Sequence, residues 1–165
     1  MTTSPTPESA AGAATTSLSA RLTAPASRRR VIDDCVQLID SEVARKGGFS
    51  GAAIKLAYST VKAVKPGFIA EAVDHLLDDF AKRLDPFYQA FLQARSQGNP
   101  RSLVDQFSAQ GSQVADALLG ITDERAGRAQ NGVVKKSYEK LRPSAKKHVE
   151  EAVPGLSRVI EKHTA

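Results

Sequence analysis

Apolar side chains recur every three or four residues along most of the chain, which is the spacing that places them on one face of an α-helix. The clearest stripe lies in the first long segment and consists of Val31, Ile32, Cys35, Val36, Ile39 and Val43. It predicts a helix over residues 25–46. A second helix is expected to start near Ser50, a good N-cap, and to end before Pro66. No segment alternates convincingly between apolar and polar residues, so we expect no β-sheet.

The same spacing continues towards the C-terminus and predicts further helices. One covers residues 67–84, after which Asp85 and Pro86 are expected to start a new helix or to kink the old one. Another opens at Asn99 and weakens at Gly111. Three shorter helices are predicted at 122–129, at 133–141 and at 143–162 with a break at Pro154. The prediction is therefore an all-α fold, a single compact bundle of about six or seven short helices.

The N-terminal segment departs from this pattern. Residues 1–16 are nearly all Ser, Thr, Pro, Ala and Gly, which bury too little apolar surface to offset the entropy cost of ordering. We predict a disordered tail at 1–17 and one helical domain at 18–165. With Arg21 and the arginines at 28–30, this segment also fits an organelle transit peptide, although an unstructured bacterial tail is the simpler interpretation.

Length and composition agree with one soluble domain. The chain has 165 residues, of which 41% are hydrophobic, close to the globular average. Its apolar runs are far shorter than the ~20 residues that cross a bilayer. Cys35 is the single cysteine, so no internal disulfide forms, and no hydrophobic signal peptide precedes it. We expect a cytoplasmic protein without a membrane span.

The net charge of +5 is unevenly distributed. Residues 31–120 hold nine basic residues against eleven acids, whereas residues 121–165 hold ten against six. The basic character therefore belongs to the two ends of the chain, and it permits weak binding to polyanions. The candidate polyanion-binding residues are Arg28, Arg29, Arg30, Lys135, Lys136, Lys140, Arg142, Lys146 and Lys147.

Five sequence strings are similar to those of a known family. They are SGAAIK from residue 50, YSTVKAVKPGF from residue 58, LLDDF from residue 76, VADALLGITDER from residue 114 and KKHVE from residue 146. Through them the chain resembles, from about Leu18 to His163, a family of small uncharacterised all-helical bacterial proteins. The resemblance implies one compact domain that excludes the tail. It implies no activity, cofactor or catalytic residue.

One group of acids and a histidine is a candidate metal site. Glu71, Asp74, His75, Asp78 and Asp79 crowd one predicted helix. Carboxylate-bridged di-iron bundles carry a Glu-x-x-His motif on each of two helices, but here the spacing is four residues and no second copy exists. A solvated acidic face is the better interpretation, and we expect no metal.

The sequence gives only weak indications of catalysis or of phosphate binding. Cys35 lies on an apolar stripe, where cysteine usually behaves as a small inert hydrophobe. The glycines at 47, 48 and 51 precede a helix, but the Gly-Lys-Ser/Thr of a phosphate-binding loop is missing. We therefore expect no enzyme, no cofactor and no catalytic residue.

Three hypotheses about function remain. The first is a non-enzymatic binding or scaffolding module, with a protein partner or self-association. The second is a basic protein that associates with nucleic acid without sequence specificity; a helix-turn-helix over residues 50–84 is disfavoured because acids dominate its second helix. The third is a carrier of an apolar small ligand, enclosed between helices near the aromatic-rich residues 68–92.

Overall fold

The structure of the chain, a computed structural model, describes residues 16–165. The tail predicted at 1–17 lies outside these residues except for its last two. Of those two, Ser17 does have a structural role, because its side chain accepts a hydrogen bond from the backbone N–H of Ala20 and caps the first helix.

Residues 16–165 form seven α-helices and contain no strand, which confirms the all-α prediction. The helices are α1 (Leu18–Leu22), α2 (Pro25–Arg45), α3 (Gly48–Lys62), α4 (Phe68–Ser96), α5 (Leu103–Ala109), α6 (Gly111–Gly127) and α7 (Gly132–Thr164). The start of α2 follows the sequence signal, since Pro25 occupies its first turn. The short helix α1 was not predicted, because five residues are too few to show a periodic pattern.

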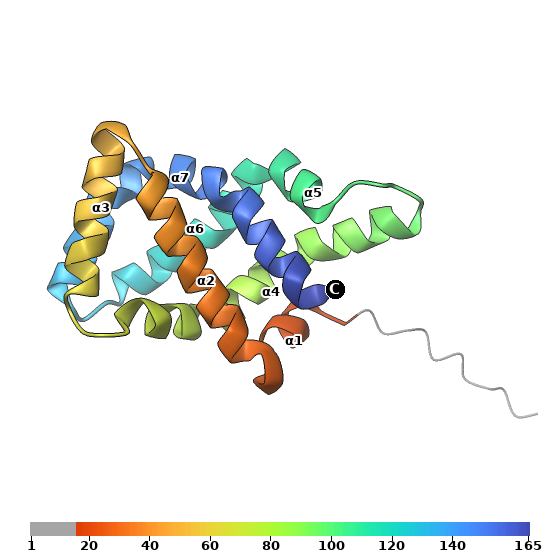
Figure 1. Cartoon of the computed structure of the whole chain (residues 1–165), viewed down its shortest axis with the longest axis horizontal. Coiled ribbons are helices and arrows are strands. Elements are labelled where there is room, and N and C mark those ends of the chain that lie inside the picture. The colour runs from red at the N-terminus through yellow and green to blue at the C-terminus, as the bar shows by residue number, and fades with distance from the viewer. Residues whose placement is uncertain (1–15) are drawn as a thin grey trace, which may run out of the picture.

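Proline was the main source of error in the predicted boundaries. Pro86 lies inside α4, and Pro143 and Pro154 lie inside α7, so α7 is one long helix where two shorter ones were predicted. A proline inside a helix removes one hydrogen bond and costs about 3 kcal/mol. The cost is outweighed by packing, because α7 contacts α2, α3, α5 and α6 along its length. Figure 1 shows α7 changing direction between a first half behind α3 and a second half beside α2.

Two helix starts also differ from the prediction. The N-cap of α3 is Gly47, and Ser50 lies within the first turn. Gly51 is required one residue later, because a Cβ there would lie 2.7 Å from the carbonyl carbon of Lys46. The N-cap of α5 is Ser102, three residues after the predicted start at Asn99.

Two acids on long helices cap the short ones. The Asp85 carboxylate on α4 accepts the backbone N–H of Leu18 at 2.7 Å, and Glu161 on α7 accepts that of Leu103 at 3.1 Å. These N–H groups begin α1 and α5 and have no partner within their own helices. Leu18 and Leu103 are fully buried, so each cap fixes a core side chain in place.

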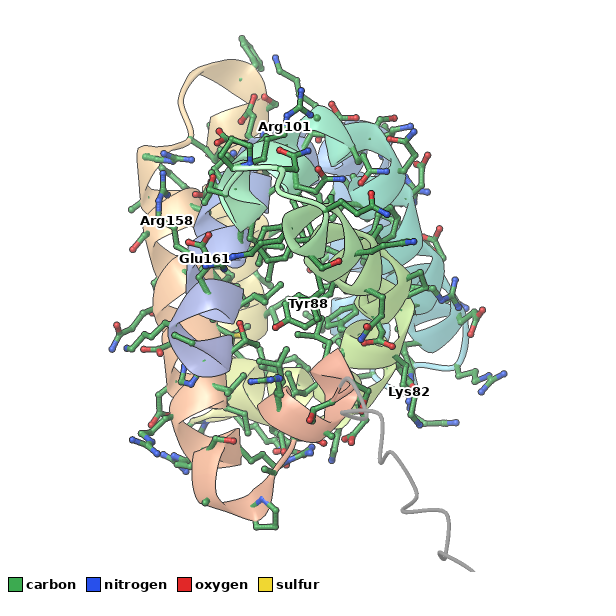
Figure 2. The ribbon with its side chains drawn as sticks, turned by 90° about the vertical axis from the view of Figure 1, so that its right-hand side faces the viewer. Lys82, Tyr88, Arg101, Arg158 and Glu161 are labelled. Atoms are coloured by element: carbon green, nitrogen blue, oxygen red, sulfur yellow. The ribbon has the colours of Figure 1, made fainter. Side chains whose placement is uncertain are left out.

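The core is formed by buried side chains from α1, α2, α4, α5, α6 and α7. Phe107 is fully buried and packs edge to face against Phe87, with ring centroids 6.2 Å apart. Figure 2 shows Tyr88 pointing into the interior, with Lys82, Arg101 and Arg158 at the surface. The aromatic residues at 87–91 therefore fill part of the core. A space lined by other residues of the same core opens towards α2 and α3.

Candidate functional site

A cavity of about 380 Å³ lies among five helices. Its wall is apolar and is formed by side chains from α2, α3, α4, α6 and α7, with Leu22 of α1 at its edge. The amphipathic stripe predicted on residues 25–46 supplies part of it, through Val31, Cys35, Ile39 and Val43. From the aromatic-rich region 68–92, only the part up to Leu84 reaches this space. The region 68–92, near which an apolar pocket was hypothesised, therefore contributes one wall of the cavity.

Beside the cavity, α2 and the second half of α7 run antiparallel and are joined by ion pairs at two places. At the first, Asp34 in the middle of α2 lies 2.8 Å from Lys162 and 2.6 Å from His163. At the second, Lys46, just after the end of α2, lies 2.6 Å from Glu151. These pairs fix the spacing of the two helices on either side of the apolar wall.

The ion pairs also shift the acidity of their carboxyl groups. Hydrogen bonding to Lys162, and then to His163, holds the pKa of Asp34 below its usual value. Hydrogen bonding to Lys46 lowers the pKa of Glu151 in the same way. Both carboxylates are therefore ionised at neutral pH.

Lys46 is a buried lysine in the cavity wall. Its side chain is 7% exposed, and its ammonium group lies 3.5 Å from Glu42 as well as 2.6 Å from Glu151. A buried charge is tolerated where such partners surround it. Because both carboxylates engage Lys46, its charge is neutralised locally and the cavity keeps its apolar character.

His148 is the polar residue of the wall with unused hydrogen-bonding capacity. Both of its ring nitrogens are buried and neither has a hydrogen-bond partner. The nearest carboxylate oxygen, on Glu151, is 3.6 Å from Nδ1, which is too far for a good hydrogen bond. Buried polar groups are paired in most proteins, so this unpaired imidazole is an exception in the packing behind the apolar wall.

Cys35 is an unreactive part of this wall. Burial, and to a smaller extent the charge of Asp34, raises the pKa of the thiol to about 11, so it is protonated at neutral pH. His148 lines the same cavity, but it lies near Lys46, which is about 16 Å along α2 from Cys35. No hydrogen bond joins the two residues, and the structure does not assemble them into a nucleophile and base.

The acids of the candidate metal site form ion pairs. Asp74 and Asp78 both contact Arg28, and Glu71 contacts Lys65. Asp79 contacts Arg125. Within residues 16–165, no three or more His, Cys, Asp or Glu side chains gather in a way that would hold a metal ion.

The candidate polyanion-binding residues fall into two groups. Several form ion pairs with carboxylates: Arg28 with Asp74 and Asp78, Arg29 with Asp33, Arg142 with Asp123, and Lys146 with Asp116. Arg30 donates to the backbone oxygen of Ala26. Among the described residues no ion pair involves the remaining four, which lie on the first half of α7: Lys135, Lys136, Lys140 and Lys147.

Sequence reasoning missed Lys46, Glu42 and His148. His148 was not among the predicted site residues. A signal for it was present, because it continues an apolar stripe of period 3.6 along α7 that consists of Leu141, Ala145, Val149, Ala152 and Leu156. The burial of Lys46 had no local signal, since its partner Glu151 is more than a hundred residues away in the sequence.

No helix within residues 16–165 is both long and apolar enough to span a bilayer.

Comparison with known proteins assigns the chain to a family but indicates no activity. No curated protein matches the chain, and no solved structure does. The model of a family of unknown function, DUF6918, matches residues 18–164, which is close to the extent over which the resemblance was drawn. The chain therefore belongs to this family.

Proposed function

We propose that the protein binds an apolar small molecule in the cavity between α2 and α7. The observation that carries this proposal is an apolar space of about 380 Å³ lined by side chains of five helices. Pockets for small ligands span roughly 300–1,000 Å³ and are mainly apolar. A cavity of about 150 Å³ holds benzene, so this one has room for on the order of 15 non-hydrogen atoms.

A bound apolar molecule would gain free energy from the wall itself. Burial of apolar surface is worth roughly 25 cal/mol per Å² removed from water. The wall exposes apolar atoms only, so an uncharged, apolar occupant fits it best.

The direct test uses the neutral fluorophore N-phenyl-1-naphthylamine, whose emission rises and shifts to the blue in apolar surroundings. We expect saturable binding to the full chain and displacement by dodecanol. Replacing Ala152, which lines the cavity, with phenylalanine fills the space and abolishes the signal. The matched control is Ala109→Phe, at an exposed position at the end of α5.

Ala145→Leu provides a second filling variant in case Ala152→Phe does not fold. Binding that survives both substitutions in folded protein would contradict the proposal. Native mass spectrometry of freshly purified protein is an independent measurement. We expect an adduct of lipid-like mass that disappears on denaturation.

The second candidate is polyanion binding through the first half of α7. It is favoured by the exposed lysines at 135, 136, 140 and 147, which have no carboxylate partner among the described residues. Retention on DNA at low salt that falls steeply as salt rises would support it. The wider expectation of a non-enzymatic, cytoplasmic bacterial module that binds or scaffolds a protein remains a prediction.

A further inference from the structure

α3 has two apolar faces, and only one of them is covered. Ile54 and Ala57 are buried in the molecule. The opposite side, which we call the outer face of α3, consists of the exposed residues Phe49, Ala52, Ala53, Leu56 and Thr60. Phe49 is 99% exposed and Leu56 is 71% exposed, and they are two turns apart on one line. A helix that is apolar on both sides normally has a partner on both sides.

The charged residues of α3 and of the turn that follows it are all lysines. Residues 47–67 contain Lys55, Lys62 and Lys65 and no acid. Lys62 and Lys65 are half exposed and pair with Asp40 and Glu71 from neighbouring helices. Lys55 is exposed, and no ion pair involves it within residues 16–165. Phenylalanine and leucine flanked by lysine are typical of helices that lie in the plane of a membrane interface.

The charge pattern distinguishes a membrane from a second copy of the chain. Two outer faces brought together would oppose lysines on α3 with lysines on its partner, with no acid of α3 to compensate. An anionic bilayer surface instead attracts each lysine near it. It also gives Phe49 and Leu56 an apolar layer to enter.

We propose that the outer face of α3 docks the protein onto an anionic membrane surface. Docking places α3 parallel to the bilayer, with Phe49 and Leu56 among the lipid headgroups and Lys55 near the phosphates. The inner side of the same helix contributes Ile54 to the cavity wall, so docking brings the cavity close to a reservoir of apolar molecules. The docking surface does not depend on the cavity being occupied.

Flotation with vesicles tests the proposal on the full chain. Vesicles of phosphatidylcholine alone are compared with vesicles that also contain phosphatidylglycerol, at low and at high salt. We expect binding to the anionic vesicles only, weakened by salt. Phe49→Ser and Leu56→Ser should each reduce binding by about tenfold, and Lys55→Glu should reduce it by about fivefold or more.

Matched controls distinguish binding through this surface from nonspecific hydrophobic or electrostatic binding to vesicles. Val133→Ser changes an apolar residue that is 47% exposed at the start of α7, and Lys82→Glu changes an exposed lysine on α4 that lies outside the candidate polyanion-binding residues. Both variants should bind like the wild type. Equal loss in Lys82→Glu and Lys55→Glu would overturn the proposal, because attraction would then be spread over the molecule.

Two further outcomes overturn it as well. One is an absence of binding to anionic vesicles at low salt. The other is a dimer in light scattering that Leu56→Ser dissociates, without vesicle binding, which would assign the outer face to a second copy. All the substituted side chains are exposed, so circular dichroism should show unchanged folding. Fluorophore binding in the same variants reports on the cavity separately, so the two proposals fail independently.

Discussion

A residue tolerates no larger side chain where two backbone segments of the chain come into contact. Gly51 is the clearest example, because an added Cβ would lie 2.7 Å from the carbonyl carbon and 2.9 Å from the carbonyl oxygen of Lys46. Backbone atoms cannot move aside as a flexible side chain can. The position therefore fixes the turn between α2 and α3, and with it the place of Lys46 in the cavity wall.

We predict that Gly51→Ala lowers the free energy of unfolding by about 1–3 kcal/mol, since the turn must open to relieve the clash. Urea denaturation measures the change. Gly47→Ala is the matched control, because nothing lies within 4 Å of a Cβ there. Equal effects of the two substitutions would show that loss of glycine, and not the contact with Lys46, sets the cost.

At the scale of helices, ion pairs position the elements that packing alone leaves loosely defined. Asp34, in the middle of α2, and Lys46, just after its end, join α2 to α7. Asp34 is 17% exposed and its partners come from the last turn of α7. Between these points, Gly155 allows close approach, because a Cβ there would lie 2.5 Å from a methyl carbon of Leu38.

We predict that Asp34→Asn lowers the free energy of unfolding by about 1–3 kcal/mol at neutral pH. The folded-state pKa of Asp34 is lower than the unfolded value, so its contribution is present above the unfolded pKa of about 4. It is lost as the pH falls through the lower, folded-state pKa. The difference between wild type and variant should therefore be constant from pH 6 to pH 7 and shrink at acidic pH.

Urea titrations at several pH values measure this dependence. The neighbouring Asp33→Asn serves as the control, because Asp33 is half exposed and pairs with a largely exposed Arg29. Exposed pairs contribute about 0–1 kcal/mol, so this variant should resemble the wild type. A difference for Asp34→Asn that stays constant down to the lowest pH would assign the loss to packing and not to charge.

For the whole molecule, the cavity couples stability to its occupant. A ligand that binds only the folded chain adds about 2.7 kcal/mol at a hundred times its dissociation constant. For a domain of this size that corresponds to a rise in Tm of roughly 5–10 °C. We expect dodecanol to produce such a rise in Tm. Thermal unfolding monitored by circular dichroism measures it. The filled variant Ala152→Phe should show none, and a rise of equal size in it would locate binding elsewhere.

The sequence by itself determined the local features of this protein. Apolar stripes of period 3.6 identified α2, the first part of α4 and the start of α7, because each helix must bury one face. The same stripes indicated that Cys35 is an internal residue. Prolines were misleading at 143 and 154, since their local cost is smaller than the packing energy of the long helix that contains them.

Only the tertiary structure decided the cavity, the burial of Lys46 and the pairing of most candidate cations. These features join residues that are far apart in the chain, such as Lys46 with Glu151 and Arg28 with Asp74. A sequence pattern reports which side of a helix is apolar. It does not report whether that side meets a neighbour, as at Ile54, or remains open, as at Leu56, because both are apolar positions of the same helix.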